Sequence, residues 1–144
     1  MMFACVPLEA FAQDYLAQYR GAADQCIATV DARGGEAECE MKVFSACNLG
    51  EPIEICMRAE AEFWAEKLEP ELAGALLEMA RQDDMQPALQ SRHDALAASQ
   101  AAWADYQDAS CRLAELTTGS AAYCLASNGF ARVMYLIELQ EPLQ

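Results

Sequence analysis

Several residue types are scarce in this chain of 144 residues, and each shortage excludes a class of function. The chain has 9 lysine and arginine residues against 23 aspartate and glutamate residues, which gives a formal charge of −14. Nucleic acid and anionic membrane surfaces repel such a chain, so neither is expected as a partner. His93 is the only histidine, and no Cys-x-x-Cys, phosphate-binding loop or nucleophile motif occurs. The sequence therefore predicts no metal, no cofactor and no enzymatic activity.

Long apolar runs are missing too. No segment approaches the roughly 18 uninterrupted apolar residues of a membrane span, so no transmembrane segment is expected. The residues before Pro7 lack the basic start and the apolar run of a signal peptide. An exported chain of this sequence would have lost its export signal.

Cysteine, in contrast, is abundant. The seven cysteines are Cys5, Cys26, Cys39, Cys47, Cys56, Cys111 and Cys124. Cytosolic thiols are kept reduced, whereas exported domains use disulfides to supplement a modest core. The spacing favours disulfides over metal binding. These cysteines predict a periplasmic or secreted protein.

Proline and glycine divide the chain into four or five amphipathic helices, and no strand pattern is present. The expected segments are a helix after Pro7 to about residue 30, a short helix at about 36–46, a third from Pro52 through Met79, a fourth after a break at 83–87, and a last one after residues 117–120. Pro70 should kink or split the third helix, and Asn128-Gly129 weakens or breaks the last. The predicted fold is a single all-α domain over residues 1–144, a compact antiparallel helical bundle with disulfide-stapled hairpins.

Apolar side chains of the fourth helix recur at intervals of seven, at Leu89, Leu96 and Trp103. Polar side chains lie beside that stripe, at Arg92, His93, Ser99, Gln100 and Tyr106. Pro87 is expected in the first turn of this helix.

Cysteines that are adjacent in sequence flank the expected turns between helices. This arrangement favours Cys26 with Cys39, Cys47 with Cys56, and Cys111 with Cys124, leaving Cys5 unpaired. Each bridge would contribute about 3 kcal/mol in the chain-entropy description. Other connectivities stay open, chiefly among the first five cysteines. Cys5 is interpreted as a free thiol rather than a lipid anchor, because Phe3 is bulky where lipoprotein processing needs a small residue.

The segment 99–111 resembles the signature of the LprI lysozyme-inhibitor family of small exported bacterial proteins. The matching residues are Gln100, Trp103, Tyr106, Asp108 and Cys111, followed after a Gly-Ser loop by Cys124, Arg132 and Leu136, and preceded by Cys39, Cys47, Cys56, Glu60, Trp64 and Leu68. The resemblance covers about residues 26–139, with residues 1–25 as an N-terminal helix. It supports the Cys111–Cys124 pair and implies lysozyme as the target.

The sequence departs from the family pattern at five polar or turn positions. These are Ala65, Glu69, Pro70, Gln107 and Gly129. Trp103 and Tyr106 are interpreted as core or half-core aromatics, and Asp108 as the partner of Arg132 in an ion pair or as a backbone-bonding group. The matched positions therefore predict a scaffold more directly than an activity.

The preferred function is a non-enzymatic binding protein that blocks a basic lysozyme-type target, since the charge of −14 would accelerate encounter. The candidate contact residues are Glu36, Glu38, Glu40, Asp83 and Asp84, with Thr117, Thr118, Gly119 and Ser120 as a loop for the enzyme's sugar cleft. An envelope interaction module of the same fold with another protein partner is the alternative. An enzyme is disfavoured, because Ser91, His93 and Asp94 point different ways on a helix and cannot form a relay.

Overall fold

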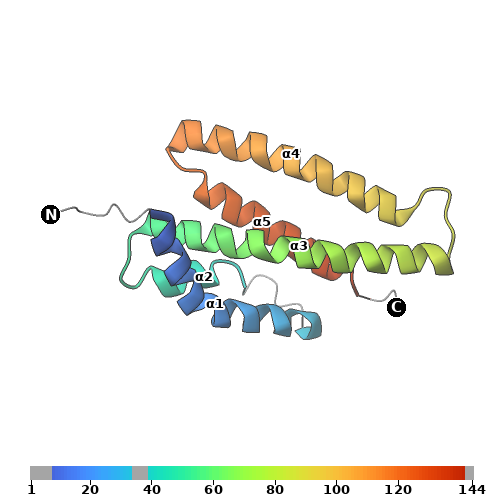
Figure 1. Ribbon diagram of the computed structural model, residues 1–144, viewed down its shortest axis with the longest axis horizontal. Helices are drawn as coiled ribbons and strands as arrows, with labels where there is room; N and C mark the ends of the chain where they lie inside the picture. Colours follow the sequence, from blue (N-terminus) through green and yellow to red (C-terminus); the bar gives the residue numbers. More distant parts are fainter. Residues whose placement is uncertain (1–7, 34–38, 142–144) are drawn as a thin grey trace.

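The computed structural model describes residues 8–33 and 39–141 and forms five α-helices (Figure 1). They are α1 (Leu8–Arg33), α2 (Lys42–Cys47), α3 (Ile53–Met85), α4 (Arg92–Thr118) and α5 (Ala122–Glu138). No strand occurs in those two ranges. The all-α prediction is confirmed. Figure 1 shows α4 running back along α3, and α5 running antiparallel to α4.

Helix α3 is the centre of the fold, because each of the other four helices packs against it. Its 33 residues give a rod of about 50 Å. Fully buried Phe63 and Trp64 on α3 pack in one core cluster with Val133 of α5. Leu136 of α5 packs in a second cluster with Ala75 and Met79 of α3. Two ion pairs, between Arg20 and Glu66 and between Asp24 and Lys67, join α1 to α3.

Pro70 does not split α3, which contradicts the expected break. The helix continues from Ile53 to Met85 with Pro70 inside it (Figure 1). The residue is exposed, so water can reach the carbonyl group that loses its amide partner. Burial of Phe63 and Trp64 before Pro70, and of Ala75 and Met79 after it, holds both halves in one rod.

Gly129 does not break α5 either. The helix is continuous from Ala122 to Glu138, and Gly129 is buried against α3. A Cβ atom at this position would lie 3.0 Å from Cβ of Trp64. The glycine therefore permits the close approach of α5 to α3, and this tertiary contact offsets its low helix propensity.

Three disulfides connect the helices in the pairs that the spacing favoured. Cys26 bonds Cys39, Cys47 bonds Cys56, and Cys111 bonds Cys124, with Cα atoms 5.5, 5.5 and 5.3 Å apart. The first bridge joins α1 to the segment before α2, the second joins α2 to the start of α3, and the third closes the α4–α5 hairpin. Cys5 lies outside the described residues.

Helix boundaries differ from the predicted ones at several turns. Helix α1 runs through residues 31–33, where a turn was expected, and α2 begins only at Lys42. Helix α3 extends across Asp83 and Asp84, so the predicted break there is wrong, and Pro87 lies in the connection to α4. Leu89, expected on the apolar stripe of the fourth helix, precedes α4 and is fully exposed. Within the described ranges, no helix is both long and apolar enough to span a membrane.

Candidate functional site

A groove runs between α3, α4 and α5, in the half of the molecule that carries the family-like residues. It has a volume of about 210 Å³. Its lining residues are Ala61, Glu62, Trp64, Ala65 and Leu68 of α3, Trp103 and Gln107 of α4, and Leu125 and Gly129 of α5. The groove exists because α4 contributes only Leu96 and Cys111 as fully buried residues, so it leans on the core near those two points.

Arg132 of α5 fixes the Trp103 wall of this groove. Its guanidinium lies 5.7 Å from the Trp103 ring centre and 5.1 Å from that of Tyr135. Nε donates to Oε1 of Gln100 at 2.8 Å and Nη2 donates to Oγ of Ser99 at 3.2 Å. Burial lowers the pKa of Arg132 from its usual value, yet an arginine stays charged at neutral pH. Neutral acceptors and two aromatic rings thus surround this cation.

The expected pairing of Asp108 with Arg132 is wrong. Asp108 is exposed, and among the described residues it forms no ion pair. Arg132 instead lies level with Ser99 and Gln100, two turns before Asp108, which corresponds to about 12 Å along α4. The antiparallel register set by the Cys111–Cys124 bridge accounts for this offset.

The matched aromatic residues differ in burial. Trp103 is half-buried, as expected. Tyr106 is 61% exposed, so its interpretation as a core or half-core aromatic is wrong. Gln107, the next residue, turns toward the groove, and its Oε1 is buried without a hydrogen-bond partner. A buried acceptor that lacks a donor is costly, by about 1–3 kcal/mol, unless a ligand or water supplies the donor.

Glu60 holds Trp64 in place from beneath the groove. Oε1 of this fully buried carboxyl accepts from Nε1 of Trp64 at 2.6 Å, and Oε2 accepts from the amide of Phe44 at 2.8 Å. The second bond caps the start of α2, where Met41 offers no side-chain cap. Burial raises the pKa of Glu60, and the bonds from Phe44 and Trp64 act in the opposite direction.

An acidic hollow of about 310 Å³ lies beside the α4–α5 turn and shares Ala61, Glu62 and Leu125 with the groove. The hollow is lined by Glu54, Arg58, Ala61 and Glu62 of α3, Glu115 of α4, residues 119–121 of the turn, and Ala122 and Leu125 of α5. Oγ of Ser120 donates to the carboxylate of Glu54 at 2.9 Å, and Arg58 pairs with the same group at 3.3 Å. Three carboxylates against one guanidinium make this end of the groove negative.

The candidate loop is a rigid turn rather than a long loop. Thr117 and Thr118 belong to the last turn of α4 and donate their hydroxyls to carbonyls of that helix. Gly119 ends α4 with φ of 83°, a left-handed conformation that glycine adopts without strain. Gly119 borders the acidic hollow together with Ser120.

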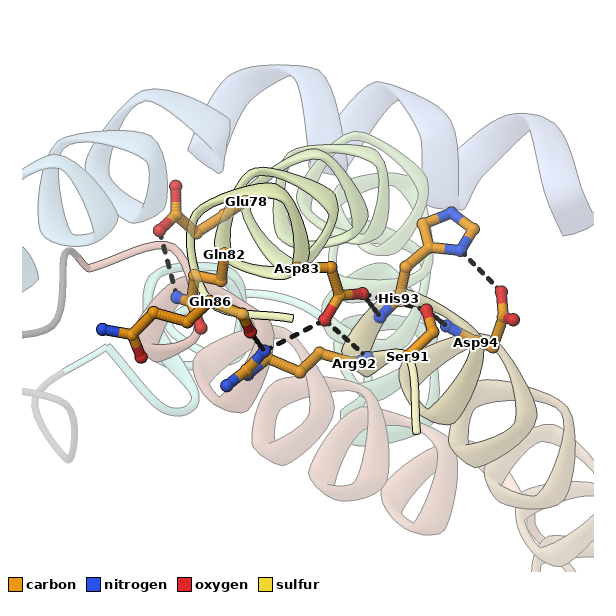
Figure 2. A network of polar contacts seen from close by, with 8 residues as sticks. All are labelled: Glu78, Gln82, Asp83, Gln86, Ser91, Arg92, His93 and Asp94. Atoms are coloured by element: carbon orange, nitrogen blue, oxygen red, sulfur yellow. Dashed lines mark hydrogen bonds and ion pairs between the residues drawn. The ribbon is translucent and has the colours of Figure 1, made fainter. Parts of the chain in front are cut away.

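Asp83 belongs to the corner between α3 and α4, as Figure 2 shows. Its carboxylate accepts from the amides of Arg92 and His93 at 3.0 and 3.1 Å and from Oγ of Ser91 at 2.9 Å. These bonds, the one from the Arg92 amide first, lower the pKa of Asp83 well below its usual range. Asp83 therefore serves as a structural anchor for the start of α4, and its role as a contact residue stays a prediction.

The remaining predicted acids are dispersed. Glu40 and Asp84 are exposed, while Glu36 and Glu38 lie outside the described residues. His93 and Asp94, expected to point apart, do meet, with Nδ1 of His93 3.0 Å from Oδ1 of Asp94. Oγ of Ser91, however, donates to Asp83 and accepts from the Asp94 amide. Ser91 is therefore the N-cap of α4. No cluster of three or more metal-ligating side chains occurs among the described residues.

Sequence reasoning missed the residues that shape the groove. Gln107 was noted only as a departure from the family pattern, and Glu54, Glu62 and Glu115 were not singled out. A helical signal for Gln107 was present, because it follows Trp103 by one turn and so lies on the same face. The position of Glu54 beside Ser120 depends on how α3 packs against the α4–α5 turn, which no local pattern encodes.

Comparison with known proteins identifies the family. The family model described as lysozyme inhibitor LprI matches residues 47–142, which is more than half of the chain. No curated protein and no solved structure matches significantly. The family comprises inhibitors rather than enzymes, and its description implies a protein partner. Membership of this family, together with the three disulfides, indicates a location outside the cytoplasm. The chain belongs to the LprI lysozyme inhibitor family.

Proposed function

We propose that this protein binds a basic lysozyme and blocks its action on the cell wall. The observation that carries the proposal is the acidic hollow at the α4–α5 turn, inside the region that matches the inhibitor family. Glu54, Glu62 and Glu115 surround a rigid turn there, in a chain of charge −14. A basic enzyme would be attracted to this face.

The turn itself is suited to enter a sugar-binding cleft. Residues 117–120 are exposed or half-exposed, and hydrogen bonds within the turn already fix them. A preformed turn loses little conformational entropy on binding, which favours affinity. Thr117, Thr118, Gly119 and Ser120 therefore remain the proposed inhibitory segment.

Exposed acids elsewhere would act mainly on the rate of encounter. Glu40 and Asp84 lie on other parts of the surface, and Glu36 and Glu38 are proposed with them from the sequence alone. Long-range attraction of this kind weakens as salt is added. We place the protein in the periplasm or outside the cell, where disulfides persist and lysozyme is encountered.

The proposal is tested by measuring how strongly the purified oxidised protein inhibits lysis of bacterial cell walls by several lysozymes. The assay is run at low and at moderate salt. Wild type should inhibit at least one basic lysozyme, more strongly at low salt. The double variant Glu54→Gln, Glu115→Gln should inhibit about tenfold less, equivalent to ~1.4 kcal/mol. The double variant Asp105→Asn, Glu138→Gln removes the same charge from exposed sites outside the hollow and should inhibit like wild type. Absence of inhibition at both salt concentrations would contradict the proposal.

A second function is favoured by the groove. Its apolar lining of Trp64, Leu68, Trp103 and Leu125 suits a partner's apolar side chain. Three departures from the family pattern, Ala65, Gln107 and Gly129, also line it. An envelope interaction module with a different protein partner would use that surface. Retention of a cell-envelope protein by wild type, without lysozyme inhibition, would support this alternative.

A further inference from the structure

Helix α4 carries an apolar stripe that neither the core nor the proposed inhibitory turn uses. The stripe consists of Ala102, Tyr106, Ala109, Leu113 and Leu116, all of them exposed. Its three large side chains have exposed fractions of 61, 62 and 79%. Figure 1 shows α4 along one outer edge of the molecule, and none of the described helices lies beyond it. We propose that this stripe is the contact surface between two copies of the chain, paired through antiparallel α4 helices.

The spacing of the stripe is typical of a helix that packs on another helix. Its members follow one another at alternating intervals of four and three residues over 102–116, which is the repeat of a coiled-coil seam. With 3.6 residues per turn, the centre of the stripe lies roughly 0.4 of a turn from buried Leu96 and Cys111. A second helix can therefore lie along the stripe, for about 20 Å, without displacing α3 or α5.

Side-chain size favours an antiparallel pair of identical helices. In the register that places Tyr106 of one copy opposite Ala109 of the other, Leu113 lies opposite Ala102, and the twofold axis repeats both pairs. Each large side chain then meets a small one, which lets two helices pack closely. A parallel pair in register would instead place Tyr106 on Tyr106 and Leu113 on Leu113, and would leave gaps between the alanines.

Charge favours the same register. Asp105 and Arg112 flank the stripe and are exposed, and within the part of the chain that the structure describes neither forms an ion pair. In the antiparallel register, Asp105 of each copy lies beside Arg112 of the other, so the twofold axis creates two ion pairs. A parallel pair would place these charges beside Ser110 and Thr117 instead. The occupant that complements the stripe in both size and charge is therefore a second copy of this chain.

The dimer is expected to be weak. One helix face from each copy lies at the low end of the sizes found for specific interfaces. The charge of −14 on each chain also opposes association, although salt at about 0.15 M screens charges that are more than about 8 Å apart. We expect a dissociation constant on the order of 10–100 µM in such a buffer. The lysis assay uses much lower concentrations, so the chain is monomeric there and the Asp105 variant keeps its role as a control.

The test is sedimentation equilibrium of the full oxidised chain at about 0.15 M salt, from about 5 µM to about 500 µM. All samples carry Cys5→Ser, because a disulfide between two copies through Cys5 would imitate the dimer. Leu113→Glu buries an unpaired carboxylate in the interface and should weaken the dimer about tenfold or more. Leu77→Glu, at a 74% exposed leucine of α3 outside the stripe, should leave it unchanged. Circular dichroism verifies that each variant keeps its helices.

Exchange of the flanking charges tests the register. Asp105→Arg and Arg112→Asp each bring like charges together across the twofold axis, so each variant alone should dimerise about tenfold more weakly. An equimolar mixture of the two variants should recover the dimer, because arginine on one copy then faces aspartate on the other at both positions. The chain that carries both substitutions should recover it as well. An effect of net charge alone would move the two single variants in opposite directions.

Three results would overturn the proposal. These are a chain that stays monomeric at every concentration, a dimer that Leu113→Glu leaves intact, and a mixture of the two charge variants that dimerises no better than either variant alone. A monomeric chain would assign the stripe to a different protein partner. The lysis assay is read separately, so a negative result there leaves the dimer result intact.

Discussion

The two sides of α3 that face α5 and α4 are built in contrasting ways. Toward α5, Gly129 brings the backbones close, and Trp64, Val133 and Leu136 are fully buried. Toward α4, contact is concentrated at Leu96 and Cys111, and a groove opens between those points. The contrast indicates that the α3–α5 contact contributes most to the stability of the domain, while α4 packs at two points and leaves an open groove between them.

Replacing each tryptophan by alanine should give the largest difference in stability between the two sides of α3. Trp64→Ala removes a fully buried ring and leaves the Glu60 carboxyl without its indole donor, so we expect a loss of about 3–5 kcal/mol. Trp103→Ala removes a half-buried ring and a contact with Arg132, so we expect about 1–2 kcal/mol. Urea denaturation measures both. Equal losses would contradict the assignment of stability to the α3–α5 contact.

Removal of individual disulfides tests the same contrast between the α5 side and the α4 side of α3. The Cys111–Cys124 and Cys47–Cys56 bridges close loops of similar length, with separations of 13 and 9 residues. One double variant, Cys111→Ala with Cys124→Ala, removes the first bridge, and another, Cys47→Ala with Cys56→Ala, removes the second. Each should therefore lose about 3 kcal/mol of unfolding free energy. Only the first pair of substitutions should raise hydrogen exchange along the C-terminal half of α4. Similar exchange in both variants would mean that α4 is not held by its ends.

Two carboxyls of α3 should respond to pH in opposite directions. Burial raises the pKa of Glu60 above its usual 4.5, so its contribution to stability is complete below pH 4.5 and decreases as pH rises through the folded value. Bonds from the start of α4 lower the pKa of Asp83 below 3.8, so its contribution is present above pH 3.8 and is lost as pH falls.

Unfolding free energies of wild type, Glu60→Gln and Asp83→Asn, measured from about pH 3 to about pH 8, test this expectation. The advantage of wild type over Glu60→Gln should shrink as pH rises, and its advantage over Asp83→Asn should shrink as pH falls. Parallel curves for the two variants would show that the two sites are not distinct.

The smallest expected effect concerns the cap of α4. Oγ of Ser91 accepts from the Asp94 amide and donates to Asp83, so Ser91→Ala should lose about 1 kcal/mol. Ser45→Ala, at an exposed serine inside α2, is the matched control and should change stability little. Thermal unfolding followed by circular dichroism measures both. A loss confined to Ser45→Ala would refute the role of the corner.

Much of the scaffold was predictable because its signals are local. Apolar spacing identified the helices, and cysteines on either side of each turn indicated the three bridges, which the structure forms. The cap of α4 was also readable in principle, since Ser91 and Asp94 stand three residues apart before an amphipathic run. Of the candidate site, the turn at 117–120 was found, but the groove beside it was not.

What the sequence determined by itself is the helical class, the bridge pairs and the strongly acidic charge, because each depends on residues close in sequence or on composition alone. Tertiary structure decided that α3 passes through Pro70, that Gly129 lies against Trp64, and that Arg132 bonds Gln100 instead of Asp108. It also placed Gln107 in the lining of an apolar groove. These outcomes depend on the register and distance between helices, and only the packing of distant segments fixes both.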